Sequence, residues 1–264
     1  MDIMVLYSLA GLVAGFLAGL LGIGGGLVLV PVLVVLFTMQ GFPESAIMPL
    51  ALGTSLATIV FTSVSSMRAH HAKGAVDWET LCRMAPGIVG GALASTALAA
   101  HLSPSALKLM FAVYAGLAAT QIICNVQPPA SRRLPGPAGL AAAGGLVGGI
   151  SVLVGVGGAV TSIPFLLWCN VSARTAIGTA SAIALPVAIA GTLGYVVIGW
   201  PVGNLPRFSL GFIHLPALAV IAVATVLTAP LGARASHRLP VPILKKALAA
   251  VLYAITLRSL LAVA

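Results

Sequence analysis

The sequence predicts an all-α polytopic membrane protein made of two inverted-topology repeats, each a glycine-broken helical hairpin followed by three transmembrane helices. The first observation is composition: 60% of the 264 residues are hydrophobic and 6% are charged. A soluble domain carries about a quarter charged residues, so most of this surface is not made for water. The second is a series of long apolar runs without period-2 alternation, which favours spanning helices over a barrel. The third is that three phrases recur in the same order in both halves.

The apolar runs are predicted to supply the membrane-spanning elements. They fall at residues 3–38, 45–67, 83–100, 105–124, 138–169, 174–199, 211–230 and 244–262. The connectors between them are too short for a soluble domain, so we expect any functional site to lie in or at the membrane. The N-terminal run has no positively charged start and no small-residue cleavage site, which indicates a retained membrane segment and not a signal peptide.

The recurring phrases indicate a duplication. "GIGGGLVLVP" at 22–31 matches "GVGGAVTSIP" at 155–164, and "ALGTSLA" at 51–57 matches "AIGTASA" at 176–182. "HLSPSALK" at 101–108 matches "HRLPVPILK" at 237–245 with one inserted residue. Each phrase alone is weak, but their shared order predicts a first membrane repeat at 1–124, a connector at 125–137 and a second membrane repeat at 138–264.

The first run of each repeat is expected to break at its glycines. Residues 3–38 as one helix would be about 54 Å long, against a hydrocarbon core of about 30 Å. Glycine weakens a helix and accepts backbone angles that other residues avoid. If the chain reverses there, the run is a hairpin that starts and ends on one side of the membrane. Three further spans then give each repeat an odd number of crossings, so the repeats must be inverted.

The basic residues favour the hairpins, because they then divide ten to three between the two sides. If the first and fifth runs were single crossings, the same count would be seven to six. Orientation follows this bias, which places the N-terminus outside the cytoplasm. The net charge of +9 is thereby explained by topology and not by nucleic acid, although an added attraction for anionic substrates is compatible with it. The ten are Arg68, Lys73, Arg83, Arg132, Arg133, Arg174, Arg234, Arg238, Lys245 and Lys246, and the three are Lys108, Arg207 and Arg258.

The broken helices predict an anion site. After Gly26 and after Ala159 a short apolar helix begins at membrane depth. Its free N–H groups and positive dipole end would hold an anion without a buried Lys or Arg. The alternative is that glycines only let helices pack closely, which we assign to the four-residue spacings of Gly11, Gly15 and Gly19 and of Gly87 and Gly91. The predicted substrate-binding residues are Gly22, Gly24, Gly25, Gly26, Gly53, Thr54, Ser55, Gly155, Gly157, Gly158, Thr161, Gly178 and Thr179.

The hydroxyls in that set have two readings. They would bind an oxyanion, or they would satisfy a neighbouring backbone carbonyl. Thr161 and Ser162 of the second half stand where the first half has Val28 and Leu29. We therefore expect the two halves to contribute unequally to the pocket.

These motifs resemble the sulfite exporter TauE/SafE family. The resemblance rests on the glycine-rich broken first segment ending in proline, the Ala-x-Gly-Thr-Ser phrase and the basic "RAHHAKGAVDW" after the next span, and it covers essentially the whole chain. It implies a multi-pass secondary transporter of the bacterial inner membrane that moves sulfite, sulfonates or related small organic anions, commonly outward. The second half reads Gly-Thr-Ala, and Ala159 replaces the last glycine of the cluster, so a strictly symmetric site is not expected.

The predicted spans have no carboxylate or histidine near their middle that could carry a coupling proton. Protons would travel with a weak-acid substrate, a histidine at the mouth would titrate, or transport would run downhill. His70, His71 and Arg174 are the candidates for a gate or proton relay, with interfacial and topogenic roles as the alternatives. Three single cysteines without a CxxC give no support for a metal or disulfide framework. We expect no cofactor and no metal.

Other classes fit less well. A membrane scaffold subunit would need an exposed recognition surface. An intramembrane enzyme would need a nucleophile–base pair or metal ligands. A carrier of metal cations would need acidic residues at the membrane midplane. A carrier for another small organic anion, such as a carboxylate, remains the alternative within transport. The expected partners are a small anionic substrate and the lipid bilayer but no nucleic acid, and a homo-oligomer is compatible with the sequence.

Overall fold

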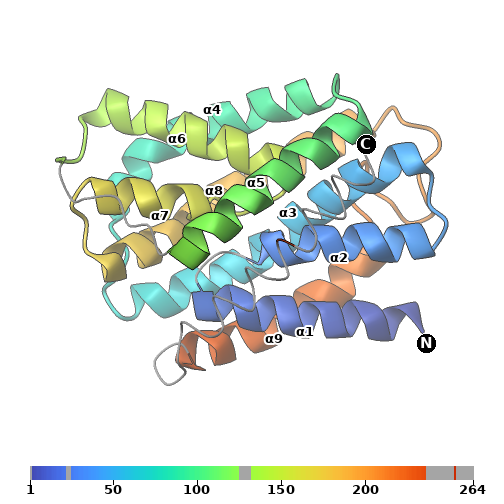
Figure 1. Cartoon of the computed structure of the whole chain (residues 1–264), viewed down its shortest axis with the longest axis horizontal. Helices are drawn as coiled ribbons and strands as arrows, with labels where there is room; N and C mark the ends of the chain where they lie inside the picture. The colour runs from blue at the N-terminus through green and yellow to red at the C-terminus, as the bar shows by residue number, and fades with distance from the viewer. Residues whose placement is uncertain (1, 22–24, 125–131, 236–252, 254–264) are drawn as a thin grey trace.

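The computed structural model describes residues 2–21, 25–124, 132–235 and 253. Over these residues the chain is all-helical, as predicted, apart from an isolated β-bridge between Ser209 and His214. In the described part of the chain, four helical segments are long and apolar enough to cross a membrane: Glu44–His71, Trp78–Ala99, Ala173–Gly199 and Leu215–Gly232. The helices are α1 (Ile3–Leu21), α2 (Gly26–Met39), α3 (Glu44–His71), α4 (Trp78–Ala99), α5 (Pro104–Cys124), α6 (Pro137–Leu153), α7 (Ala159–Trp168), α8 (Ala173–Gly199) and α9 (Leu215–Ala235), shown in Figure 1.

The two glycine breaks are confirmed at the predicted places. The first run is divided between α1, which ends at Leu21, and α2, which begins at Gly26; the second is divided between α6 and α7. Gly25 and Gly158 immediately precede the two short helices, with φ of +71° and +79°. Most L-residues rarely adopt this left-handed conformation, so glycine is favoured there. Gly22 and Gly24 lie outside the described residues.

Each break reverses the chain. A Cβ added to Gly25 would lie 3.2 Å from Ala18 Cβ of α1. At the other end of α2, Gln40 Nε2 donates to the Tyr7 hydroxyl of α1 at 2.6 Å. The residue after the break is therefore near the end of α1, and the residue after α2 is near its beginning. The first apolar run is folded into a hairpin (Figure 1).

The second run returns in the same way. Arg132, five residues ahead of α6, donates its backbone N–H to Trp168 O at the end of α7 at 3.2 Å. Its guanidinium carbon lies 5.1 Å from the centre of the Trp168 ring. The 10 residues of α7 rise only about 15 Å, half of a hydrocarbon core of about 30 Å. This hairpin therefore has a second arm too short to cross.

Small residues bring the other helices together. A Cβ on Gly87 or Gly91 of α4 would overlap backbone carbonyl oxygens of α6, at Ala141 and Gly145. In the same way Gly11 and Gly15 of α1 pack directly on α9. The packing role predicted for these four glycines is confirmed. The predicted run at 244–262 falls outside the described helices, and the repeat boundaries at 124 and 138 stay a prediction.

Candidate functional site

The two glycine breaks meet in the interior of the molecule. Gly26, the first residue of α2, faces the turn between α6 and α7: an added Cβ would lie 2.5 Å from Gly155 O and 2.9 Å from Val156 Cα. Ser55 of α3 donates its hydroxyl to Gly155 O at 2.9 Å, and this bond is fully buried. The structure thus brings together predicted site residues that are about half the chain apart.

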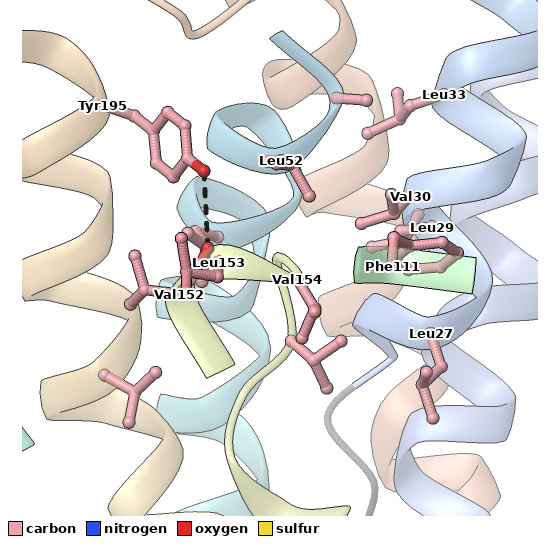
Figure 2. Close-up of a cluster of buried hydrophobic side chains, with 14 of the residues drawn as sticks. Leu27, Leu29, Val30, Leu33, Leu52, Phe111, Val152, Leu153, Val154 and Tyr195 are labelled. Carbon is pink, nitrogen blue, oxygen red and sulfur yellow. Dashed lines mark hydrogen bonds between the residues drawn. The ribbon is translucent and has the colours of Figure 1, made fainter. Parts of the chain in front are cut away.

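Apolar side chains surround this contact. Figure 2 shows Leu27 and Val30 of α2 on one side and Leu52 of α3 and Val152 at the end of α6 on the other. All four are at most 1% exposed. The Tyr195 hydroxyl of α8 donates to Val152 O at 3.5 Å (Figure 2). A polar group placed here would be dry, so the backbone donors at the break are in a medium where their electrostatic effect is strong.

Both short helices begin here without a side-chain cap. The carbonyl of Gly158 accepts from the N–H groups of Thr161 and Ser162. In the same way, the carbonyl of Gly25 accepts from the N–H groups of Val28 and Leu29 in α2. The N–H groups of a first helical turn have no partner within the helix. Two buried helix N-termini, each with a positive partial charge, therefore lie at the contact between the breaks. Anion binding there stays a prediction.

The Gly53–Thr54 pair of α3 docks the loop that leads into α9. Gly53 leaves no room for a side chain, because an added Cβ would overlap Phe212 O. Thr54 Oγ1 accepts the backbone N–H of His214 at 3.0 Å in a buried position. This pair therefore holds a segment of the other half of the chain by shape and by a hydrogen bond.

The equivalent Gly178–Thr179 pair of α8 docks the loop that leads into α4. An added Cβ on Gly178 would overlap Ala75 O, and Thr179 Oγ1 accepts the backbone N–H of Asp77 at 3.0 Å. The recurring phrase thus has one structural role, carried out twice and in opposite directions. Substrate contact by Thr54 and Thr179 stays a prediction.

The remaining hydroxyls of the predicted set have known partners. Ser55 follows the second reading, since it donates to a backbone carbonyl. Thr161 Oγ1 lies 3.4 Å from the Tyr114 hydroxyl of α5. Gly157, also in the set, would place an added Cβ 3.1 Å from Ala184 and Ile59, which locates the break between α3 and α8.

Ser151 of α6 is a candidate site residue that the sequence reasoning missed. It is 0% exposed, and its hydroxyl has no hydrogen-bond partner among the described residues. It is directed at the start of α7, since its Oγ lies 3.3 Å from the position of an added Cβ on Gly158. At the corresponding place of the first half, Ala18 lies 3.2 Å from that position on Gly25. Aligning the two glycine phrases and extending the alignment backward would have found this Ser–Ala difference.

The gate candidates lie at one end of the helices, where His71 and Arg174 are exposed and His70 is half-buried. His71 Nδ1 accepts from Trp78 Nε1 at 3.2 Å, and the two rings meet edge to face. Arg174 donates to Lys73 O at 2.7 Å, which ties the start of α8 to the α3–α4 connector. A role for His70, His71 or Arg174 in gating stays a prediction.

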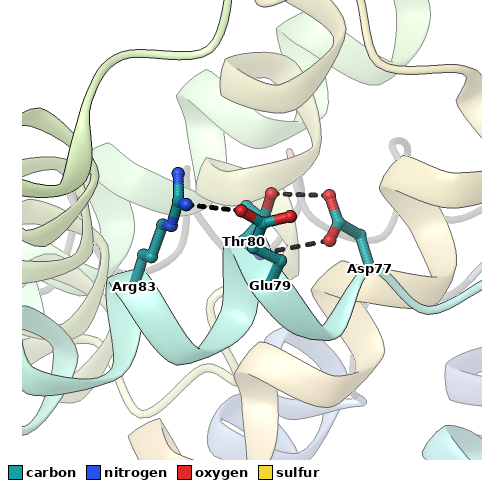
Figure 3. Close-up of polar contacts among 4 residues, drawn as sticks. All are labelled: Asp77, Glu79, Thr80 and Arg83. Atoms are coloured by element: carbon teal, nitrogen blue, oxygen red, sulfur yellow. Dashed lines mark hydrogen bonds and ion pairs between the residues drawn. The ribbon is translucent and has the colours of Figure 1, made fainter.

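The first turn of α4 beside them is held by charge. Figure 3 shows the Asp77 carboxylate accepting from the Thr80 N–H and hydroxyl, at 3.1 Å and 2.6 Å, and an ion pair between Glu79 and Arg83. Acidic groups at a helix N-terminus are favoured by the helix dipole. These acids therefore have a structural explanation.

His214 is a second residue that the sequence reasoning missed. It ends the loop before α9, is 5% exposed, and is surrounded by the rings of Tyr7, Phe37 and Phe42 at centroid distances of 5.2–6.2 Å. Burial lowers the pKa of His214 from about 6.5 to about 4. The histidine is therefore neutral in the folded protein at neutral pH.

This lowered pKa makes stability depend on pH. Below pH 6.5 the unfolded chain binds a proton at His214 that the folded chain does not bind until about pH 4. The contribution of neutral, buried His214 to the free energy of unfolding is fully present above pH 6.5. It falls by about 1.4 kcal/mol per pH unit as the pH drops from 6.5 toward 4. We expect thermal unfolding in detergent to show a smaller drop in Tm, between about pH 7 and about pH 5, for His214→Gln than for the wild type. The exposed His101→Gln is the control, and an equal drop in all three proteins would contradict the assignment.

Comparison with known proteins gives the family context. A family model described as sulfite exporter TauE/SafE matches residues 7–259. A probable membrane transporter protein of Haemophilus influenzae is 35% identical over 97% of this chain and 98% of its own length. Probable membrane transporter proteins of Methanocaldococcus jannaschii and Bacillus subtilis are 23% and 24% identical, each over 89% of this chain and over 86% and 91% of their own lengths. No solved structure matches the chain.

Proposed function

We propose that the cargo of this protein is a small sulfur-containing anion such as sulfite or an organosulfonate. The premise is that the chain belongs to the sulfite exporter TauE/SafE family of membrane transporters. The proposed location is the inner membrane of a bacterium. The observation that carries the proposal is the meeting of two uncapped, buried helix N-termini at the glycine breaks. Such backbone donors bind a compact oxyanion at a site that has no fixed positive charge, so the anion is not held by a buried Lys or Arg.

The proposed mechanism is alternating access between two inverted repeats. Each Gly-Thr pair is docked on a loop of the opposite half, which gives two similar contacts for the halves to rock against. The anion would bind between the breaks and be exposed first to one side and then to the other. In this proposal the glycines have two uses: they reverse the chain and they let a ligand approach the backbone.

Ser151 is proposed as the side-chain donor of the site. Its hydroxyl is buried without a partner and directed at the start of α7, and an oxyanion there would accept its proton. A hydrogen bond to a charged group contributes about 1.5–3 kcal/mol. We expect Ser151→Ala to raise the KM for sulfite in proteoliposomes at least about tenfold, with the folded protein still recovered.

A matched control removes another buried hydroxyl without a partner among the described residues. Thr192→Val takes Oγ1 from α8 outside the predicted set, and it should leave the KM within about a factor of two. An unchanged KM in Ser151→Ala would remove Ser151 from the site without removing transport. Stronger inhibition by a carboxylate than by any sulfonate would favour the alternative cargo.

A further inference from the structure

A small cavity adjoins the two breaks at Ala18 and Ala184 and extends toward the end of α3 that leads to its basic connector. It has room for about one water molecule. Four hydroxyl groups line it, and the other lining residues are small. It is bounded by Ala18 and Gly19 of α1, Thr62, Ser63 and Ser66 of α3, Ser181 and Ala184 of α8, and Ala229 of α9.

Each of the four hydroxyls donates its hydrogen bond to another protein group. Thr62 donates to Thr58 O at 2.8 Å and Ser63 to Val60 O at 3.0 Å, both within α3. Ser181 donates to the carbonyl of Ile177 at 3.0 Å, so the 3.4 Å contact between the two serines is a donation from Ser66 to Ser181. A carbonyl oxygen cannot donate, which fixes these directions. The cavity is therefore faced by oxygen lone pairs and not by donors.

This lining suits a cation and not the transported anion. An oxyanion would need donors, and it is larger than one water. Ala18 and Gly19 belong to the last turn of α1, where the helix dipole places negative partial charge. Half-helix C-terminal ends and backbone carbonyls are the groups that secondary transporters offer to sodium, and the hydroxyl lone pairs here would add further neutral oxygen ligands. No carboxylate lines the cavity, whereas calcium sites rely on carboxylates.

The hydroxyls that α3 gives to the cavity have no counterparts on α8. Aligned through the Gly-Thr phrase, the positions of Thr62, Ser63 and Ser66 are taken on α8 by Val187, Ala188 and Gly191. Thr62 and Ser63, like Ser181 of α8, are each 4% exposed. The symmetric packing that the two halves share therefore does not explain the hydroxyls of α3.

We propose that the cavity between the hydroxyls of α3 and α8 and the end of α1 binds a small monovalent cation of the size of sodium, and that anion transport depends on it. The proposal rests on the proposed transport function. It supplies the coupling ion that a chain without a mid-span carboxylate otherwise lacks. A bound cation would tie α1 to α3 and α8 and so stabilise the arrangement of helices described here.

The test is sodium binding by the purified full-length protein, measured with radioactive sodium and by thermal unfolding in NaCl against choline chloride at equal ionic strength. The wild type should bind sodium saturably and unfold at a higher temperature in NaCl. Thr62→Val and Ser66→Ala should each weaken sodium binding by about tenfold or more, since even outer-shell partners of a metal contribute that much. Thr225→Val removes a buried hydroxyl of α9 that does not line the cavity, and it should bind sodium like the wild type.

Failure of this site and failure of the transport proposal are distinguishable. Sulfite flux that is the same in sodium and choline, with no bound sodium, would refute the site and leave transport standing. A second outcome is that the wild type binds sodium, Thr62→Val does not, and the wild type moves none of the anions tested. That outcome would support the cation site and contradict the proposed cargo. If Thr62→Val does not fold, Ser66→Ala and the wild-type melts decide the question. Sodium binding unchanged in both variants would also refute it.

Discussion

Gly158→Asp is expected to lower anion flux by at least about tenfold while leaving the protein folded. Aspartate is a favoured N-cap, and its charge suits the positive end of a helix. Its carboxylate would occupy the N–H groups at the start of α7 and repel an anion in a low-dielectric interior. The Cβ would lie 3.1 Å from Val147 and 3.4 Å from Val187, tight contacts with side chains that can shift. Flux in proteoliposomes, with size-exclusion chromatography as the folding check, measures the effect.

Two variants separate charge from backbone strain. Gly41 has φ of +70°, close to that of Gly158, and nothing within 4 Å of an added Cβ. Gly41→Asp therefore carries the same conformational penalty outside the site and should transport normally. Gly158→Asn has nearly the same size without the charge and should retain more flux than Gly158→Asp. Wild-type flux and KM in Gly158→Asp would show that the anion does not bind at this helix end.

Gly53→Ala and Gly178→Ala are each expected to lower the stability of the folded protein. Each new methyl would overlap a backbone carbonyl of the docked loop, at Phe212 and Ala75 respectively. A backbone carbonyl cannot rotate away as a side chain can, so the loop must move. That movement would also break the Thr54 or Thr179 hydrogen bond. Overpacking of about 1–3 kcal/mol corresponds to a fall in Tm of roughly 2–12 °C.

Gly90 of α4 provides the control. It lies inside a helix, and nothing lies within 4 Å of an added Cβ. Gly90→Ala should hold or raise the Tm, because alanine favours a helix over glycine by about 1 kcal/mol. The measurement is thermal unfolding of the three variants in the same detergent. Equal Tm values in all of them would contradict the close docking of the two loops.

The breaks were predictable because their signal is local. An apolar run too long for one crossing and a cluster of glycines are both legible in sequence, and α2 begins at Gly26 as the pattern indicates. The positive φ of Gly25 and Gly158 explains why these positions are glycine. Helix existence and the packing role of Gly87 followed from equally local spacing.

The partners of the polar residues were not predictable, because they depend on segments far apart in the chain. Thr54 binds the N–H of His214, 160 residues away, and no local pattern reports that contact. His214 itself lies near the start of the predicted run at 211–230 and, in the structure, in the loop before α9. The aromatic rings that bury it come from the first hairpin and the loop after it. Ser151 is visible only as a difference between two aligned halves. Duplication made the motifs detectable, and tertiary docking gave them their roles.

Flux across proteoliposomes of the purified protein tests the central claim most directly. Sulfite, a sulfonate and a carboxylate would be compared under imposed pH gradients, in sodium and in choline. The account predicts saturable flux of sulfite or the sulfonate that is greatly reduced in Gly158→Asp and retained in Gly41→Asp. Absence of flux for every anion, from protein shown to be folded, would contradict it.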